Sequence, residues 1–172
     1  MRILSRCVPG IPKCFNACKM GSVEAVCTSP EKGTVKHMVE SVLLREGWGI
    51  EGDAHAGEWH RQVSLLAGES IDMVREVMPG LENGMFGENL VTRGVELLGL
   101  SIGTCLRIGE SVLLEVTQIG KACHNGGCPI KTATGDCIMP REGIFCRVLH
   151  GGEVLPGCAI EVVKCGEREG EL

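Results

Sequence analysis

The residues whose types could do chemistry gather between positions 118 and 147, where cysteines, a histidine, lysines and arginines are set among glycines and prolines. Cys123 lies here directly after a predicted strand, with Lys121 and His124 beside it. A thiol beside cations loses its proton more easily, and only the thiolate is a good nucleophile or soft-metal ligand. We therefore expect Cys123 to be the functional residue, as a nucleophile, a persulfide carrier or a metal ligand.

Two further cysteines in this region, Cys128 and Cys137, complete a C-x4-C-x8-C spacing with Cys123. One interpretation is a resolving thiol that exchanges a disulfide or a persulfide with Cys123. Another is a zinc site formed by the three thiolates and His124. The usual C-x2-C spacing is missing, however, and the adjacent Cys123 and His124 are awkward joint ligands. The third alternative is that Cys128 and Cys137 are only packing or loop residues.

A second group of polar residues lies in the glycine-bounded turn at residues 52–57 and just after it. Asp53 and His55 could coordinate a metal or orient each other, and Arg61 could bind an anion through two parallel hydrogen bonds. The structural alternative is that Asp53 caps a turn and Arg61 pairs with a core carboxylate. The residue types leave both interpretations open.

Composition places the chain among ordinary globular proteins. Its 172 residues suffice for one domain with a core, and 44% of them are apolar. The formal net charge is −5, aromatic residues make up 3%, and no basic block is present. Nucleic-acid binding, which needs clustered cations and often stacking aromatics, is therefore excluded. A membrane span is excluded because no apolar run reaches about 18 residues.

The chain contains eleven cysteines, a high count. A chain of this length does not need disulfides to complete its core, and its first residues are too short and too interrupted by proline for a signal peptide. We therefore expect a cytoplasmic protein in a reducing compartment, in which most of the cysteines are small buried apolar residues.

Short alternating strands dominate the pattern from residue 20 onward. One helix is predicted over residues 69–78, where Ile71, Val74 and Met78 share a face before Pro79 and Gly80 end it. Residues 104–108 and 112–119 predict a hairpin, and residues 145–149 and 153–155 predict another. Further strands are predicted at residues 23–27, 39–44, 62–66, 89–92 and 159–163. Together they indicate a mainly β, barrel-like fold with one or two peripheral helices.

Three parts are expected along the chain. Residues 1–19 form an N-terminal arm, for which a loose segment, a start codon assigned too early and a short packed helix are the alternatives. Residues 20–164 form the domain, and residues 165–172 form a polar, frayed tail.

Several segments together resemble the MOSC domain, the family named for the C-terminal part of molybdenum-cofactor sulfurases. They are Gly-Asp-Ala-His-Ala-Gly at 52–57, Trp-His-Arg-Gln-Val-Ser-Leu-Leu at 59–66, Gly-Met-Phe-Gly-Glu-Asn-Leu at 84–90, Ile-Gly-Thr at 102–104 and Gln-Ile-Gly-Lys-Ala-Cys-His at 118–124. The segment at 135–145 is similar to the short, stand-alone bacterial branch. The resemblance covers about residues 20–164.

This resemblance implies a β-barrel-like fold with a functional cysteine at Cys123. It implies binding of a molybdopterin-type cofactor with Cys123 as the molybdenum ligand, or transport of sulfur toward molybdenum or other metal–sulfur centres. The pyridoxal-phosphate desulfurase domain of the full sulfurases does not fit into residues 1–19. A partner is therefore expected, either a cysteine desulfurase or a protein of cofactor biosynthesis or insertion.

The resemblance also suggests how other residues would hold the cofactor. The amide of Asn89 could bind a pterin edge or a phosphate, or it could equally satisfy backbone groups at a strand entry. Arg141 and Arg147 could complete an anion pocket with Lys121 and Lys131, or they could simply be solvated. Two other functions stay open: a molybdenum-dependent oxidoreductase or persulfide transferase with turnover, and a zinc-stabilised structural module.

Overall fold

The computed structural model describes residues 20–123 and 128–163, a mainly β structure with few helices. Most of the predicted strands are present with small shifts of their ends. The strands are β1 (Gly21–Thr28), β2 (His37–Val39), β3 (Val42–Arg45), β4 (Gly49–Ile50), β5 (Val63–Ala67), β6 (Leu90–Arg93), β7 (Cys105–Ile108), β8 (Val112–Ile119), β9 (Ile144–His150), β10 (Gly152–Val154) and β11 (Ala159–Val163). The helices are α1 (Gly68–Arg75), the 3₁₀ turn η1 (Leu97–Gly99), α2 (Pro129–Thr134) and α3 (Met139–Glu142).

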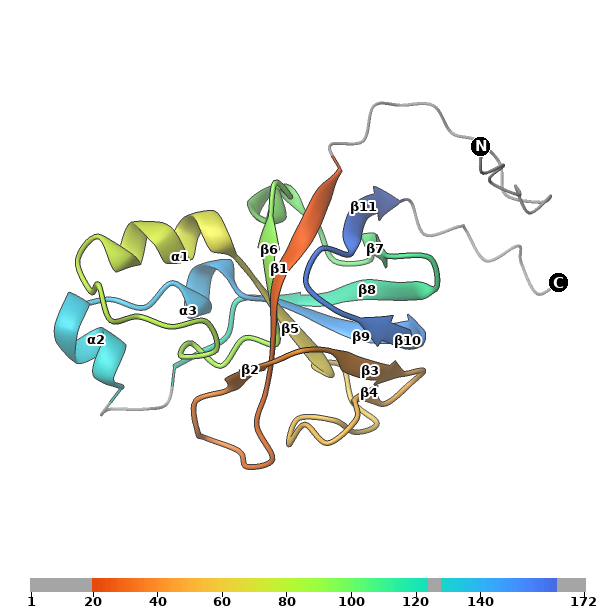
Figure 1. Cartoon of the computed structure of the whole chain (residues 1–172), viewed down its shortest axis with the longest axis horizontal. Helices are drawn as coiled ribbons and strands as arrows, with labels where there is room; N and C mark the ends of the chain where they lie inside the picture. Colours follow the sequence, from red (N-terminus) through yellow and green to blue (C-terminus); the bar gives the residue numbers. More distant parts are fainter. Residues whose placement is uncertain (1–19, 124–127, 164–172) are drawn as a thin grey trace, which may run out of the picture.

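Seven strands close into a barrel, which confirms the expected fold class. Their order is β11-β7-β8-β9-β5-β6-β1, and the first and last strands pair where Gly21 lies opposite Ile160. Closure leaves the barrel without open edges. Strand β2 extends the sheet by pairing with the far end of β1, and β3, β4 and β10 form a small separate sheet (Figure 1).

The neighbouring strands β5 and β6 are parallel, and α1 lies in the connection between them. Parallel neighbours need such a crossover, for which a helix is the usual solution. The predicted helix over residues 69–78 is therefore confirmed, with Ile71 fully buried on its inner face. Regular helix ends at Arg75, and the chain continues as turns to Met78.

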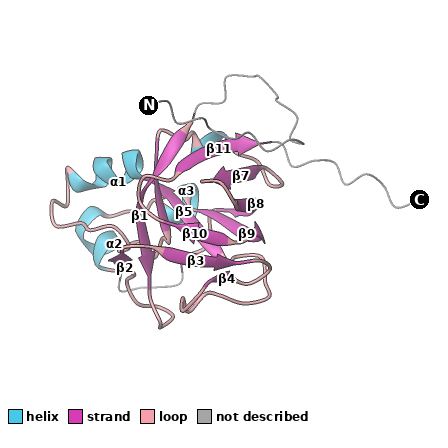
Figure 2. Ribbon diagram, turned by 45° about the vertical axis from the view of Figure 1, so that its right-hand side comes forward, coloured by secondary structure: helices cyan, strands magenta, loops and turns pink. Residues whose placement is uncertain are grey.

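Two apolar clusters hold the domain together. The larger fills the barrel, and the second lies between the outside of the barrel and the helices. All three α-helices lie on the same side of the barrel in Figure 1, and α1 and α2 are again side by side at the edge of the molecule in Figure 2. The second cluster comprises Ala25, Cys27, Leu66, Ile71, Leu81, Phe86, Val91, Ile130, Ile138, Met139 and Phe145. This side of the molecule is where the candidate site is assembled.

Two predicted elements are wrong in detail. The strand predicted at residues 39–44 is split into β2 and β3, which belong to different sheets. The hairpin predicted between residues 145–149 and 153–155 does not form, because β10 pairs with β3 whereas β9 pairs with β5 and β8. Pairing choices of this kind are set by tertiary packing, which local alternation does not report. The arm expected at residues 1–19 and the tail expected at residues 165–172 lie outside the described residues.

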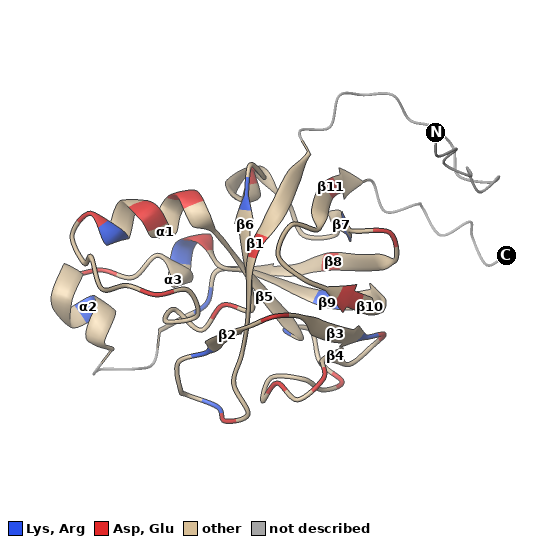
Figure 3. Cartoon of the chain, in the orientation of Figure 1, with Lys and Arg blue, Asp and Glu red and all other residues tan. Residues whose placement is uncertain are grey.

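Lysines and arginines are interspersed with acidic residues over the described part of the chain rather than gathered on one face (Figure 3). None of the helices in residues 20–123 and 128–163 has the length and apolar character needed to cross a membrane.

Candidate functional site

Strand β8 delivers Cys123 to the helical side of the barrel. Gly120 follows the strand with φ +66°, and its N–H donates to the carbonyl oxygen of Gly143 at 2.7 Å. A Cβ at position 120 would lie 2.0 Å from the carbonyl oxygen of Pro140, so the chain packs against α3 at a distance that only glycine permits. Lys121 then turns inward half-buried, and Cys123 is exposed with a free thiol.

Cys123 lines a pocket of about 530 Å³, and Cys128 and Cys137 line it as well. The structure thus brings together the three cysteines that the sequence singled out. The other walls come from the loop before β2, from the turn after β4, from the connection before β6 and from α2 and α3. They are Gly33, Thr34, Val35, His55, Met85, Phe86, Gly87, Lys121, Pro129, Met139 and Pro140.

Lys121 is the cation of this pocket. Burial, together with the nearby charge of Arg61, holds the pKa of Lys121 below its ordinary value, while the thiols of Cys123 and Cys137 act in the opposite direction. Its Nζ lies 5.8 Å from the ring centroid of Phe145, which supplies a cation–π contact. The predicted neighbourhood of Lys121 and Cys123 is therefore present, whereas His124 lies outside the described residues.

The thiols differ in their surroundings. Burial raises the pKa of the Cys137 thiol, although the N–H of Met139 donates to its sulfur. Burial raises the pKa of Cys27, in the second apolar cluster, to about 12, and the carboxyl of Glu88 acts in the same direction. Of the described cysteines, Cys27, Cys123, Cys128, Cys137, Cys146 and Cys158 carry free thiols, whereas Cys105 is disulfide-bonded. Within the described residues, no three His, Cys, Asp or Glu side chains are arranged to hold a metal ion together.

Asp53 is the centre of a buried polar network. It accepts hydrogen bonds from Lys36 Nζ at 2.5 Å, from the N–H of His55 at 2.9 Å and from Asn89 Nδ2 at 3.0 Å. Burial alone would raise the pKa of Asp53, but hydrogen bonds from His55 and Lys36 hold it well below its ordinary value. Asp53 therefore stays ionised, as the counterion of a lysine whose side chain is 2% exposed. The sequence did not single out Lys36.

Asn89 is fully used inside the protein. Its Oδ1 accepts from the N–H and the hydroxyl of Ser64, both at 3.1 Å, and its Nδ2 also donates to the carbonyl oxygen of Cys27 at 3.0 Å. Asn89 thus links β1, β5 and Asp53, and Asp53 in turn holds the backbone of His55, which lines the pocket. This is the backbone-satisfying alternative that the sequence left open. His55, by contrast, reaches the pocket wall.

Glu88 is a second residue that sequence reasoning missed. Its side chain is buried, Oε1 accepts the N–H of Gly84 at 2.6 Å, and Oε2 is buried with no hydrogen-bond partner. Burial raises its pKa to about 7. Between these two hydrogen-bonded positions lie Met85, Phe86 and Gly87, which line the pocket. The signal available in the sequence was the position of Glu88 in a glycine-rich segment, between Gly87 and Asn89. The residue types alone do not show that its side chain is buried.

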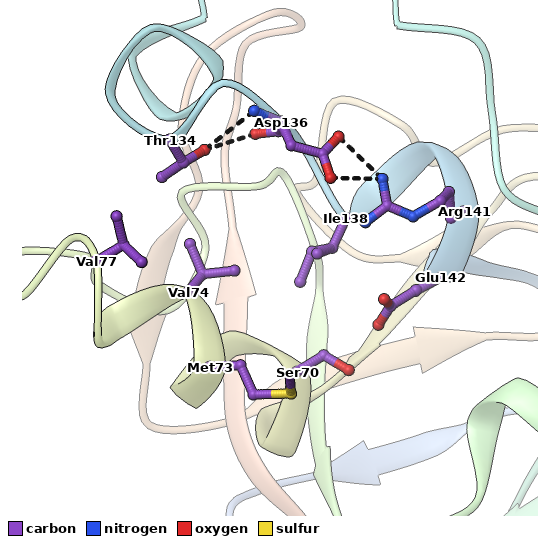
Figure 4. A pocket seen from close by; sticks show the side chains of 9 residues that line it. All are labelled: Ser70, Met73, Val74, Val77, Thr134, Asp136, Ile138, Arg141 and Glu142. Carbon is purple, nitrogen blue, oxygen red and sulfur yellow. Dashed lines mark hydrogen bonds and ion pairs between the residues drawn. The ribbon is translucent and has the colours of Figure 1, made fainter.

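Three arginines were expected near the cofactor. Arg61 stacks over Trp59, with 4.8 Å from Cζ to the ring centroid, and its Nε is buried without a partner. Arg147 pairs with Glu115 at 2.6 Å on the barrel and does not line the pocket. Arg141 pairs with Asp136 at 2.7 Å at a separate pocket of about 230 Å³ between α1 and α3 (Figure 4). Only Arg61 lies close enough to Lys121 to act on it appreciably.

Comparisons with known proteins agree with this architecture. A model of the MOSC domain family matches residues 52–161. The protein YflK of Bacillus subtilis (strain 168), described as uncharacterized, is 27% identical over 149 residues, which are 80% of this chain and 66% of that protein. The chain thus spans just under two thirds of the length of this relative.

Solved structures share the fold. The YuaD protein from Bacillus subtilis superposes with a TM-score of 0.70 at 22% identity, over 83% of this chain and 95% of that one. YiiM from Geobacillus stearothermophilus gives a TM-score of 0.62 at 19% identity, over 84% of this chain and 75% of that one. YiiM from Escherichia coli gives 0.57 at 21% identity, over 84% and 71%.

Proposed function

The chain belongs to the MOSC domain family, which is associated with molybdenum-cofactor-related sulfur transfer, and we propose that it binds a molybdopterin-type cofactor and carries sulfur on Cys123. The observation that carries the proposal is the exposed thiol of Cys123 on the wall of a pocket of about 530 Å³, beside the half-buried Lys121. The thiol can reach both a bound ligand and an incoming partner protein.

The residues present fit such a cofactor. Small-molecule sites commonly measure about 300–1,000 Å³, and this pocket falls in that range. A thiolate is a suitable donor for a metal that prefers soft ligands. Arg61 does not itself line the pocket, but it adds a second positive charge near Lys121. An anionic group bound beside Lys121 would be attracted by both charges.

Each residue has a defined role in this proposal. Cys123 would hold the metal, and Lys121 with Arg61 would bind the cofactor's phosphate. When bound, the cofactor would supply a metal centre that accepts sulfur. Cys123 would alternatively carry the sulfur as a persulfide, whose anionic outer sulfur Lys121 stabilises by opposite charge. Asp53 and Asn89 would act through positioning, because their polar atoms are occupied by protein hydrogen bonds.

The proposal includes a partner and a setting. A cysteine desulfurase would supply the sulfur, and a protein of cofactor biosynthesis or insertion would receive it. The exposure of Cys123 suits transfer between proteins, because a thiolate must reach the donor's sulfur to exchange with it. A reducing cytoplasm is the setting in which a free carrier thiol persists.

The test compares Cys123→Ala with Cys158→Ala after expression in a host that makes the cofactor. Cys158 is also a free, partly exposed cysteine, but it lies before β11 and does not line the pocket. We expect Cys123→Ala to lose bound molybdenum and the added mass of sulfur in elemental analysis and intact-mass spectra, with an unchanged melting curve. Cys158→Ala keeps both. Equal metal and sulfur loading in Cys123→Ala and the unsubstituted protein would refute the proposal.

A further inference from the structure

The pocket holds more thiols than a simple sulfur carrier needs. Cys128 and Cys137 line it together with Cys123, and all three are free. A carrier requires only one thiol to hold the sulfur. A second thiol in the same pocket could therefore serve a later step, the release of that sulfur.

Cys137 is held in a defined place. It lies in the short connection between α2 and α3, where its N–H donates to Asp136 Oδ1 at 2.8 Å. Its carbonyl oxygen accepts from Arg141 at 3.4 Å, and its sulfur accepts the N–H of Met139. These hydrogen bonds hold the backbone of Cys137 at the pocket wall, and its thiol is half-buried there.

Lys121 connects Cys137 to Cys123. Its ammonium group interacts electrostatically with the sulfurs of both residues, and Cys128 is not among the charges that act most strongly on it. A cation near two sulfurs lowers the repulsion that an attacking thiolate meets near a second anionic sulfur. The Cys137 thiol interacts electrostatically with the thiols of both Cys128 and Cys123, and the feature that we use to select Cys137 is the hydrogen-bonded backbone that holds it between α2 and α3.

Cys123 and Cys137 both line this pocket of about 530 Å³, so their side chains border a common space. A disulfide joins residues whose Cα atoms lie about 4.4–6.8 Å apart, and the disulfide mapping below tests whether the two residues approach each other that closely.

We propose that Cys137 is the resolving thiol of this site: it attacks a persulfide on Cys123, joins Cys123 in a disulfide and releases the carried sulfur inside the pocket as hydrogen sulfide. The inference rests on the proposed function, because the persulfide on Cys123 is its starting point. It adds the discharge step, in which the sulfur leaves as sulfide for a metal centre rather than passing to another protein thiol.

The step balances without an external oxidant. The Cys137 sulfur forms a bond to the Cys123 sulfur, and the bond from Cys123 to the outer sulfur breaks. The electron pair of that bond leaves with the outer sulfur, which takes up the proton that Cys137 gives up. Two electrons thus pass from the two cysteine thiols to the sulfane sulfur. Small thiols then reduce the disulfide back to two thiols by exchange.

The experiment loads reduced protein with glutathione persulfide, removes the excess donor and follows hydrogen sulfide release without added thiol. The variants are Cys137→Ser and Cys137→Ala, and Cys128→Ser is the matched control on the same pocket. Intact mass measures loading, and peptide mapping after alkylation identifies the disulfide. We expect equal loading throughout, about tenfold slower sulfide release in both Cys137 variants, and a Cys123–Cys137 disulfide in the unsubstituted protein and in Cys128→Ser.

The outcomes separate this inference from the proposed function. Absence of persulfide on Cys123 in the unsubstituted protein would overturn both. Normal loading with undiminished release in both Cys137 variants, or a disulfide that maps to Cys128, would overturn the role of Cys137 and leave the carrier function standing. The two Cys137 variants are judged by melting temperature, and either one that folds suffices for the comparison.

Discussion

Glu88 gives the sharpest quantitative test of the structure. Its side chain is 0% exposed, one carboxyl oxygen accepts the N–H of Gly84 at 2.6 Å, and the other has no partner. Burial raises its pKa from 4.5 to about 7. At about 1.4 kcal/mol per pKa unit, this difference corresponds to about 3 kcal/mol of folding free energy.

The direction of the effect follows from proton binding. Below pH 4.5 the carboxyl is protonated in the folded and the unfolded chain, so it contributes no pH dependence. Between pH 4.5 and about 7 the unfolded chain loses the proton while the folded protein keeps it, and stability falls as the pH rises. Above about pH 7 both states are ionised, and the penalty of the buried charge is fully present.

The substitution Glu88→Gln removes the charge and keeps an oxygen that can accept from Gly84. We expect the variant to match the original protein near pH 4.5 and to exceed it by up to about 3 kcal/mol at about pH 8, in urea unfolding monitored by circular dichroism. Glu110→Gln, at the exposed turn between β7 and β8, is the control and should show no such pH-dependent difference. A Glu88→Gln variant that is less stable at about pH 8 would refute the reasoning.

Two other predictions concern the buried ion pair of Asp53 with Lys36 and the close contact of Gly120 with Pro140. Asp53→Asn leaves the buried Lys36 without its counterion and should cost about 3–5 kcal/mol in urea unfolding, whereas adding Lys36→Met should recover part of the loss; additive losses would contradict the pairing. Gly120→Ala places a Cβ 2.0 Å from the carbonyl oxygen of Pro140 and should lower stability and change the alkylation rate of Cys123. Gly135 has a similar positive φ, but a Cβ there would meet open space, so Gly135→Ala is the control and should show only the backbone strain of about 1–2 kcal/mol. Equal effects of the two substitutions would contradict the close contact at Gly120.

The sequence predicts the barrel well because its strands alternate and glycine turns separate them. The helix over residues 69–78 is found for the same reason, since Ile71 and Val74 mark one face. Partner choice is a different matter. Residues 153–155 alternate well enough to predict a strand, but whether β10 pairs with β9 or with β3 depends on contacts across more than 100 residues, as between Glu153 and Leu43.

The candidate site likewise contains residues that the sequence predicts and residues that it does not. Cys123, Lys121, Cys128 and Cys137 could be selected from their types and spacing, and the pocket contains all four. The burial of Lys36 and Glu88 could not be predicted. Charged residues are rarely buried, and only the folded packing shows the counterion of the first and the missing partner of the second.

The two glycine-containing segments at 52–57 and 84–89 are joined in the fold and both reach the pocket wall. Asp53 and Asn89 meet by a hydrogen bond of 3.0 Å, and each segment carries a neighbour to the pocket wall, His55 in one and Phe86 in the other. A buried ionised pair is retained here although apolar packing could fill the same volume, which is consistent with a requirement for fixed geometry. The thiols, in contrast, come from the loop after β8 and from the α2–α3 region on the other walls. One half of the pocket is thus connected to buried hydrogen bonds around Asp53, while the other half supplies the thiols. A substitution at Asp53 should therefore weaken ligand binding without abolishing persulfide formation on Cys123.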